Sequence, residues 1–396
     1  MNDQISIIQL EGSDYEMGSN QGRRFETQIH RLYNDLTNSE EFLSSKPSFL
    51  PKFLYRYLAN NVISKMIKDP IKDYLPNQWN FLKGLSEGAD LSMDKLLLIQ
   101  AIDALGTQIS HYEIKENISA SFNQCSAVGI TSERSNSGGV LLIKNWDGPE
   151  FLAKHIIFRQ VNPSESKRIS TIGSGITGLG GINNGMNNKG LSIVYNYAYP
   201  QNIGKKGIPP MFLIRDALEN CMNVEEVVFR LEKLPRLGGA NMMVADVSGD
   251  LAVLEISPSD IKVRRTGENG ERSFLVSTNH YITSEMRSIE IPRDAVYNNN
   301  AAEAFRGKPV HKSSIRRYKN AKDILKTKTS DKIDLEFLNK QVQSSHGPKN
   351  KPSEDSFCNH GKDISTGFGV MIDVKKKNFY ATIGKPCEGT MQKLIM

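Results

Sequence analysis

A single cysteine and an Asn-Trp-Asp triplet lie near the two ends of the stretch NQCSAVGITSERSNSGGVLLIKNWDG, residues 123–148. Two apolar runs flank a polar turn centred near Asn136, a pattern that predicts a β-hairpin. Residues equidistant from such a turn face each other across an antiparallel pair, about 5 Å apart. We therefore expect Cys125 to lie opposite Trp146 or Asp147.

This arrangement could make the cysteine a nucleophile for amide carbonyls. A thiol needs a base for that attack, and the hairpin contains no histidine. The α-amino group of Cys125 would serve if the Gln124–Cys125 bond were cut, because an α-amine has a pKa of about 7.7–8.0. Asp147 would then hold the ammonium, while Asn145 or another amide would donate hydrogen bonds. The alternative is an inert, buried cysteine and a strand that ends in turn-forming residues.

The composition is that of an ordinary globular protein, with 38% hydrophobic and 24% charged residues among 396. The net charge of +6 is spread along the chain instead of forming the basic face of a nucleic-acid binder. The beginning of the chain is acidic and lacks a signal-length apolar segment, and no run of 18 apolar residues occurs. The four cysteines show no CxxC spacing. We expect a cytoplasmic protein with reduced thiols that binds neither nucleic acid nor membrane.

The chain has two parts with different sequence patterns. Residues 1–122 have mostly helical periodicity, whereas short strand-like runs separated by Gly-, Asn- and Asp-rich turns begin at Ser126. Strand-rich blocks interrupted by helices favour antiparallel sheets covered by helices. Residues 344–363 are predicted to form a loop. The predicted strands are 126–131, 140–146, 154–161, 192–199, 241–247, 250–257, 261–266, 272–278, 366–374 and 378–384, and the predicted helices of this part are 210–222, 223–234 and 313–325.

Several motifs follow one another in a characteristic order. They are EGSDYEMGSNQGRRF, LSEGADLSMDKLLLIQ, Cys125-Ser126 with Gly139 and Asn145-Trp-Asp147, GLGGINNGMNNKGLSIVYNY, IPPMFLIRDALE, GGANMMVADVSGDLAVLEISP and VSTNHY. Together they resemble the acyl-coenzyme A:6-aminopenicillanic acid acyltransferase (isopenicillin N acyltransferase) family, a branch of the N-terminal-nucleophile hydrolases. The likeness covers nearly the whole chain and is therefore more specific than any single motif.

This resemblance implies an α+β fold, a four-layer αββα sandwich of two stacked antiparallel sheets with helices outside. It also implies a precursor that cuts itself between Gln124 and Cys125. The two products, a helical chain 1–124 and a catalytic chain 125–396, would stay associated as one structural domain. The implied reaction is hydrolysis or transfer of an acyl group on an amide nitrogen.

The resemblance also implies roles for individual residues. Cys125 would be the nucleophile and its freed amine the base, and Asp147 matches the family's catalytic aspartate. Asn196 matches the asparagine that stabilises the oxyanion, a contribution commonly worth about 3 kcal/mol of barrier. Asn279, in the segment STNHY, resembles a further site asparagine, whereas His280 is expected to be structural or to face the substrate. Without the resemblance, Asn196 and Asn279 would be ordinary strand-end asparagines.

Two departures from the family pattern bear on function. Gln124 stands where the family usually has glycine, and its side chain could slow self-cleavage by limiting strain at the scissile bond. The family's catalytic arginine is missing from HGKDISTGFGVMIDV, where only Lys362 and Asp363 are charged near its place. Either Lys362 or another arginine substitutes, or the substrate has a different charge.

Metal and nucleotide sites are not expected. Cys358 and His360 could ligate a metal, but the sequence offers no second ligand pair at zinc-site spacing. We expect Cys221 and Cys387 to be packing residues. The segment Gly178-Leu-Gly-Gly181 lacks the complete dinucleotide fingerprint.

These observations favour a self-processing cysteine amidohydrolase or acyltransferase that needs no cofactor. Its substrate would be a small amide or acyl compound, with a coenzyme A thioester as a conceivable acyl donor. A second hypothesis is a non-processing homologue that binds amides or peptides without turnover, which Gln124 and the missing arginine favour. A third is a histidine-dependent cysteine protease whose chain stays uncut.

Overall fold

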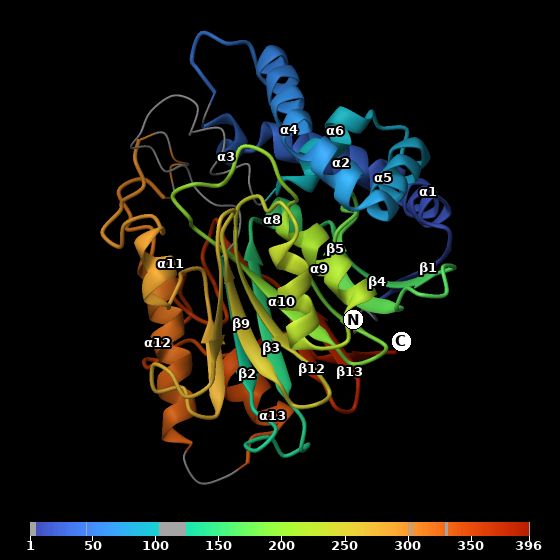
Figure 1. The fold of residues 1–396 in the computed structure, drawn as a ribbon. Coiled ribbons are helices and arrows are strands. Elements are labelled where there is room, and N and C mark those ends of the chain that lie inside the picture. The colour runs from blue at the N-terminus through green and yellow to red at the C-terminus, as the bar shows by residue number, and fades with distance from the viewer. Residues whose placement is uncertain are drawn as a thin grey trace.

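Two β-sheets stacked face to face form the centre of the protein (Figure 1). The computed structural model describes the chain except residues 1–4, 45, 103–123, 300, 302, 304, 329–331 and 396. Within the described part, one sheet has eight strands and the other six. Strands β2 and β3 of the smaller sheet lie directly against β7 of the larger one.

The strand order explains how distant segments reach one site. The larger sheet has the order β1-β4-β5-β6-β7-β8-β9-β10, and the smaller one β11-β2-β3-β12-β13-β14. Neighbouring strands are antiparallel except β1 and β4, which are parallel. The strands are β1 (Ile7–Gly12), β2 (Gln124–Ile130), β3 (Leu141–Gly148), β4 (Ile156–Pro163), β5 (Thr171–Ile176), β6 (Asn184–Asn187), β7 (Ser192–Ala198), β8 (Gly239–Ala245), β9 (Leu251–Ile256), β10 (Ile261–Arg265), β11 (Phe274–Ser277), β12 (Ser365–Asp373), β13 (Asn378–Ile383) and β14 (Gln392–Leu394).

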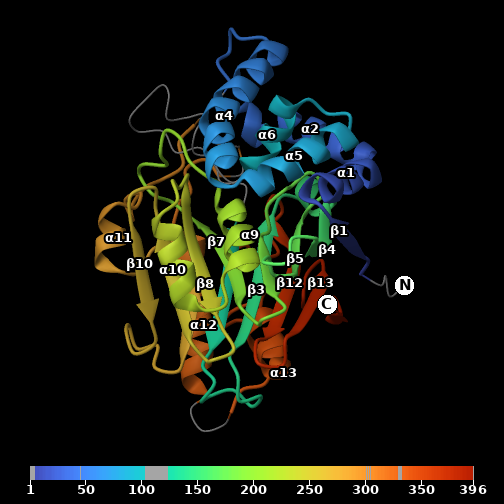
Figure 2. The same cartoon turned by 45° about the vertical axis from the view of Figure 1, so that its right-hand side comes forward.

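Helices cover the outer face of each sheet, so the expected αββα sandwich is confirmed (Figures 1 and 2). Helices α9 and α10 lie on the larger sheet, whereas α12 and the π-helix η1 lie on the smaller one. The Asn223 side chain accepts a hydrogen bond from the Glu226 backbone nitrogen and so fixes the start of α10. The helices of this part are α8 (Glu150–Ala153), α9 (Pro210–Asn220), α10 (Val224–Glu232), α11 (Ser284–Ser288), α12 (Lys312–Thr327), α13 (Leu335–Phe337) and η1 (Leu338–Gln343).

The helices of the first hundred residues gather at one end of the sandwich (Figure 2). They are α1 (Asp14–Arg24), α2 (Glu26–Asn38), α3 (Glu40–Leu43), α4 (Lys52–Tyr74), α5 (Pro76–Gly88) and α6 (Met93–Gln100). Helices α1 and α5 touch backbone to backbone. A Cβ atom on Gly18 would lie 2.0 Å from the Phe81 carbonyl oxygen, and one on Gly84 would lie 2.0 Å from that of Tyr15. Glycine is therefore required on both sides of this contact.

The sequence predictions account for most of these elements. The predicted strands and the three predicted helices of the second part are confirmed within a few residues, and residues 344–363 form a loop apart from a single bridge at His360. Strands β1, β5, β6 and β14 were not predicted. Strands β5 and β6 contain glycines that weaken the strand pattern, and β14 is only three residues long. No helix in the described ranges is long and apolar enough to cross a membrane.

Substituting Gly18 with alanine should destabilise the protein, because the added methyl group would overlap the α5 backbone. We expect a loss of at least about 1–3 kcal/mol in the free energy of unfolding, the usual range for overpacking. Chemical denaturation would measure this loss. The control is Lys83→Ala on the exposed side of α5, which should change the free energy by less than about 0.5 kcal/mol. Equal stability of both variants would contradict the close helix contact.

Candidate active site

The hairpin of β2 and β3 brings Cys125 directly opposite Trp146, which confirms one of the two predicted pairings. Gln124 pairs with Asp147, and Ser126 pairs with Asn145. Side chains of directly opposite residues point to the same face of a sheet, and successive residues alternate. The Cys125 thiol and the Asp147 carboxyl group therefore lie on opposite faces of the hairpin.

Contacts on each face support this alternation. Lys144, on the face of Cys125 and Trp146, donates to the backbone oxygen of Tyr195 in the opposing sheet. Asn145, on the other face, donates through Nδ2 to the backbone oxygens of Gln343 and Phe357, at 2.9 and 3.0 Å. The thiol thus faces the space between the sheets, whereas the carboxylate faces the outer layer.

The backbone of Cys125 is held by an asparagine and an arginine. Its nitrogen donates to Asn279 Oδ1 at 2.8 Å, and its carbonyl oxygen accepts from Arg317 Nη1. Arg317 also donates to Asn279 Oδ1 at 2.9 Å and to the Ser126 hydroxyl at 2.6 Å. Asn279 in turn donates to the Tyr197 backbone oxygen of the larger sheet. These bonds fix the position of the Gln124–Cys125 peptide nitrogen.

Arg317 is a site residue that sequence reasoning did not name, although it allowed that an arginine other than one near Lys362 could serve. It is fully buried on α12, and burial lowers its pKa while the nearby charges of Asp147 and Cys125 oppose that change. The buried positions of α12 are Ser314, Arg317, Ala321 and Leu325. This helical spacing places an arginine on the apolar face of a predicted helix, a signal that was available in the sequence.

Asp147 has one satisfied and one open carboxylate oxygen. Oδ1 accepts from the Thr366 hydroxyl at 2.7 Å, whereas Oδ2 is buried and makes no hydrogen bond of standard geometry to the described residues, although the Asn359 side-chain amide is close enough to favour the ionised form. Burial raises the pKa of Asp147 to about 7, although the charges of Arg317 and Lys144 oppose the rise. A cation arriving at Oδ2 would favour the ionised form.

The thiol of Cys125 is protected from water and has a cation nearby. Its side chain is buried, and burial raises the pKa of the thiol, an effect that the Lys144 ammonium opposes. Lys144 also could have been identified from the sequence, because it lies within an otherwise apolar predicted strand. Lysine is rarely buried unless its charge is paired. The net effect is a raised thiol pKa, so the Cys125 sulfur needs a proton acceptor before it can act as a nucleophile.

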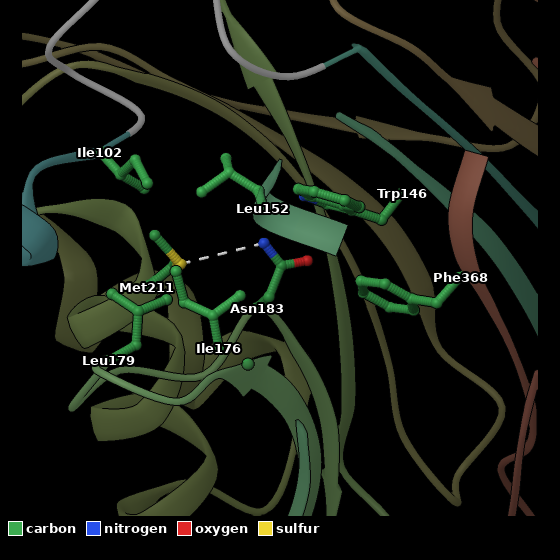
Figure 3. Close-up of a pocket in the computed structure, with 9 residues that line it drawn as sticks. Ile102, Trp146, Leu152, Ile176, Leu179, Asn183, Met211 and Phe368 are labelled. Atoms are coloured by element: carbon green, nitrogen blue, oxygen red, sulfur yellow. Dashed lines mark hydrogen bonds between the residues drawn. The ribbon is translucent and has the colours of Figure 1, made fainter. Parts of the chain in front are cut away.

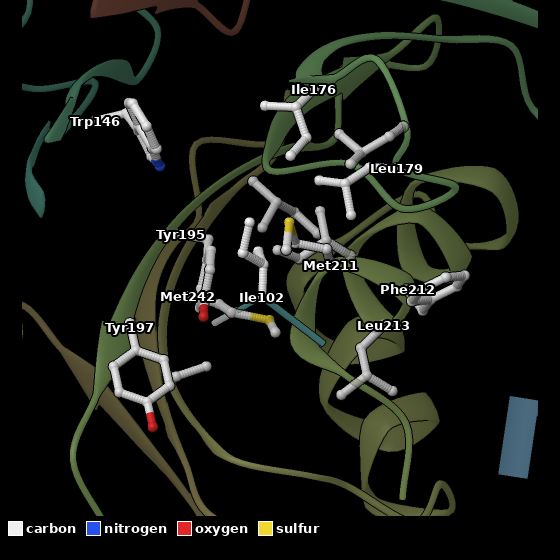
Figure 4. Packing of buried hydrophobic residues seen from close by; sticks show 14 of the residues in the cluster. Ile102, Trp146, Ile176, Leu179, Tyr195, Tyr197, Met211, Phe212, Leu213 and Met242 are labelled. Atoms are coloured by element: carbon white, nitrogen blue, oxygen red, sulfur yellow. The ribbon is translucent and has the colours of Figure 1, made fainter. Parts of the chain in front are cut away.

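Asn196 reaches the same space from the opposing sheet. Its neighbours Tyr195 and Tyr197 point into the hydrophobic layer with Met211 and Leu213 of α9 (Figure 4). Because alternate residues of a strand face opposite ways, Asn196 points toward the smaller sheet, where Nδ2 donates to Ser277 Oγ at 3.0 Å. Its buried Oδ1 lacks a hydrogen-bond partner among the described residues.

An apolar pocket adjoins the hairpin on the thiol side. Its cavity volume is only about 20 Å³, and Trp146, the cross-strand partner of Cys125, forms one wall (Figure 3). The Trp146 ring stacks on Phe368, with centroids 5.6 Å apart. The other lining residues are Ile102, Leu152, Gly175, Ile176, Leu179, Asn183 and Met211. The lining suits an aliphatic or aromatic group with few polar atoms.

The remaining predicted residues lie as follows. Lys362 is exposed in the loop before β12, and Arg317, not Lys362, contacts Cys125. Gln124 is partly buried, and its Oε1 accepts from the Ser313 hydroxyl at 3.2 Å. His280 Nδ1 lies 2.7 Å from Ser314 Oγ, and burial lowers the pKa of this imidazole well below its usual value. His280 is therefore buried against α12, and its expected structural or substrate-facing role stays a prediction.

The sequence was also compared with models of known protein families. The acyl-coenzyme A:6-aminopenicillanic acid acyl-transferase model matches residues 134–361, more than half of the chain. This chain belongs to that family. The matched range begins after Cys125 but includes Asp147, Asn196, Asn279 and Arg317. Membership in the acyltransferase family supports an enzyme that acts on acyl-amide bonds.

Solved structures similar to this family member include three enzymes. An N-acylethanolamine-hydrolyzing acid amidase ortholog from Caenorhabditis elegans has 15% identity and a TM-score of 0.42, with 63% of this chain and 93% of that chain covered. A mutant conjugated bile acid hydrolase from Clostridium perfringens has 16% identity and a TM-score of 0.39, with 68% and 97% covered. Penicillin V acylase from Agrobacterium tumefaciens has 17% identity and a TM-score of 0.38, with 65% and 83% covered. A comparison with curated proteins gave no match.

Replacing Arg317 with methionine should destabilise the site, because the guanidinium satisfies several buried groups around Cys125. We expect a loss of about 3–5 kcal/mol in the free energy of unfolding, measured in a Cys125→Ala background. The neighbouring Arg316 pairs with Asp355 and is 55% exposed. Arg316→Met should therefore change the free energy by less than about 1 kcal/mol. A similar loss in both variants would mean that the buried contacts of Arg317 have been misjudged.

Proposed function

We propose that the protein is a self-processing cysteine amidohydrolase or acyltransferase, cut between Gln124 and Cys125. The observation that carries this proposal is the environment of one peptide nitrogen. The Cys125 nitrogen is oriented by Asn279, which Arg317 also contacts, and the open oxygen of Asp147 belongs to the residue paired with Gln124. An ammonium group formed at this nitrogen would supply the cation that a buried carboxylate requires.

Self-cleavage in this proposal begins with the thiol. The Cys125 sulfur attacks the Gln124 carbonyl carbon, the C–N bond breaks, and the thiol proton passes to the leaving nitrogen. Water then hydrolyses the thioester between Gln124 and Cys125. The products are the chains 1–124 and 125–396, and Cys125 gains a free thiol and a free α-amine.

Turnover of an external amide would use the same atoms. The α-amine of Cys125 accepts the thiol proton, and Sγ forms a thioester with the substrate acyl group. The amine of the substrate then leaves with a proton. Asn196 lies between the sheets, on the side that the thiol faces, and its amide could stabilise the oxyanion. Water would release a carboxylic acid, whereas an amine acceptor would give a new amide. A coenzyme A thioester could replace the amide as acyl donor.

The acyl group in this proposal enters the apolar pocket, whose side chains must move apart to admit it because the cavity volume is only about 20 Å³. Trp146 links the pocket wall to the nucleophile, because it lies directly opposite Cys125 and on the same face. An apolar acyl chain would remove this surface from water and orient the carbonyl carbon toward the sulfur. The resolving water or amine would approach after the leaving amine has departed.

The second candidate is a homologue that binds amides or peptides without turnover. Gln124 favours it, because the side chain and its bond to Ser313 add constraints at the scissile peptide. A histidine-dependent mechanism has less support: no described histidine hydrogen-bonds to Cys125, and His111 lies outside the described residues. The state of the chain separates these alternatives.

Intact-mass spectrometry of the freshly purified protein should give two masses, those of 1–124 and 125–396. Cys125→Ala should give a single mass, because it removes the attacking sulfur. Gln124→Gly should be cut faster than wild type, since it removes the constraint at the scissile bond. A single wild-type mass without amide turnover would favour the binding protein. A single mass with turnover would favour a mechanism without a freed amine.

Filling the pocket should shorten the acyl chains that the enzyme accepts. A Cβ atom on Gly175 would meet only the Gly181 oxygen, at 3.7 Å, so the backbone leaves room for a side chain to begin there. The series Gly175→Ala, Val and Leu should progressively lower kcat/KM for long N-acyl amides, by at least about tenfold for leucine. Short-chain amides serve as the internal control. An equal loss for all chain lengths would place the acyl group elsewhere.

A further inference from the structure

Two cysteines and two histidines converge beside the smaller sheet, outside the site described above. Cys358, His360 and His346 come from the loop of residues 344–363, and Cys387 comes from the turn between β13 and β14. The sequence analysis identified only Cys358 and His360 as possible ligands, because His346 and Cys387 do not lie at the spacings of known zinc-binding motifs. Cys387 is thus a contact partner of Cys358 and His360, not simply a packing residue.

Four of the six donor-atom separations in this quartet are close to those of a tetrahedral metal site. Sγ of Cys358 is 3.4 Å from Sγ of Cys387 and 3.7 Å from Nε2 of His360. His360 Nε2 is 3.2 Å from both Cys387 Sγ and His346 Nε2. All four atoms lie within 4.8 Å of one another. Tetrahedral zinc, with Zn–S of about 2.3 Å and Zn–N of about 2.0–2.1 Å, separates its ligand atoms by about 3.3–3.8 Å.

We propose that Cys358, His360, His346 and Cys387 bind one zinc ion. Two thiolates and two imidazoles form a ligand set typical of structural zinc, and four protein ligands leave no open position for a substrate. A carboxylate lies behind one ligand: Glu388 Oε1 is 3.8 Å from His360 Nδ1, the ring nitrogen that does not face the sulfurs. Carboxylates commonly orient zinc-bound histidines in this way.

The zinc ion would fasten the loop that supports the candidate active site. Asn359 lies between two of the ligands, and its backbone nitrogen donates to Thr366 Oγ1 at 2.8 Å. The same Thr366 hydroxyl donates to Asp147 Oδ1. One residue before Cys358, the Phe357 oxygen accepts from Asn145. The metal would therefore position the partners of Asn145 and Asp147 without touching the reacting atoms.

A cobalt(II) titration tests this proposal independently of the acyl chemistry. The full chain with Cys125→Ala is reduced, stripped with a chelator and titrated with cobalt(II), and zinc(II) is then added. We expect one cobalt per chain, the intense visible bands of a tetrahedral thiolate site, and displacement of cobalt by one zinc. Zinc should also raise the melting temperature of this protein.

Matched variants assign the site. Cys387→Ser and His346→Ala should weaken metal binding by at least about 100-fold and abolish the zinc-dependent rise in melting temperature. Cys221→Ser should behave like its parent, because Cys221 is a buried cysteine outside the quartet. Two variants are used so that a folding defect in one, detected by circular dichroism, leaves the other as the test.

Three results would overturn the proposal. The reduced parent protein could fail to bind cobalt or zinc. The metal could bind equally well after both substitutions in the quartet. Alternatively, mass spectrometry could find a Cys358–Cys387 disulfide in the purified protein, and the protein could remain unable to bind metal after reduction.

Discussion

The register of one hairpin determines how the candidate active site is built. Because Cys125 lies opposite Trp146 and Gln124 lies opposite Asp147, the thiol and the carboxylate occupy different faces of the same sheet. Asp147 is therefore on the face away from the sulfur, whereas the backbone nitrogen of Cys125 belongs to the same residue as the thiol and donates to Asn279. A shift of one residue would exchange the faces of all the site residues on β3 and separate the thiol from the apolar pocket.

Burial of several charged groups follows from this geometry. Arg317, Lys144 and Asp147 are all withdrawn from water near Cys125. Such charges are tolerated only when hydrogen bonds and opposite charges surround them. Arg317 donates to Cys125, Ser126 and Asn279, whereas Asp147 keeps one oxygen open. The site therefore combines a satisfied cation with an incompletely satisfied anion, an imbalance that suits a centre where charge develops during reaction.

Local sequence patterns predicted the parts of this structure that neighbouring residues determine, such as a hairpin and a helix start. The β2–β3 pairing follows from alternation about one turn, and the helix of Asn223 and Glu226 follows from its cap. Contacts between residues far apart in the sequence could not be predicted from local patterns. Arg317 reaches a cysteine 192 positions away, and His346 and Cys387 meet only through the order of strands in the smaller sheet. Lys362 was nominated because it lies near the family arginine in sequence, but α12 supplies the nearby cation instead.

The parallel pairing of β1 with β4 has a consequence for the life of the protein. The first strand of the chain forms an edge of a sheet whose other strands all come after Cys125. After a cut at Gln124, this strand would be held only by noncovalent bonds, and refolding would change from a first-order to a second-order process. A mature protein of this kind would depend on slow unfolding for its persistence, because dilution would oppose reassembly of separated fragments.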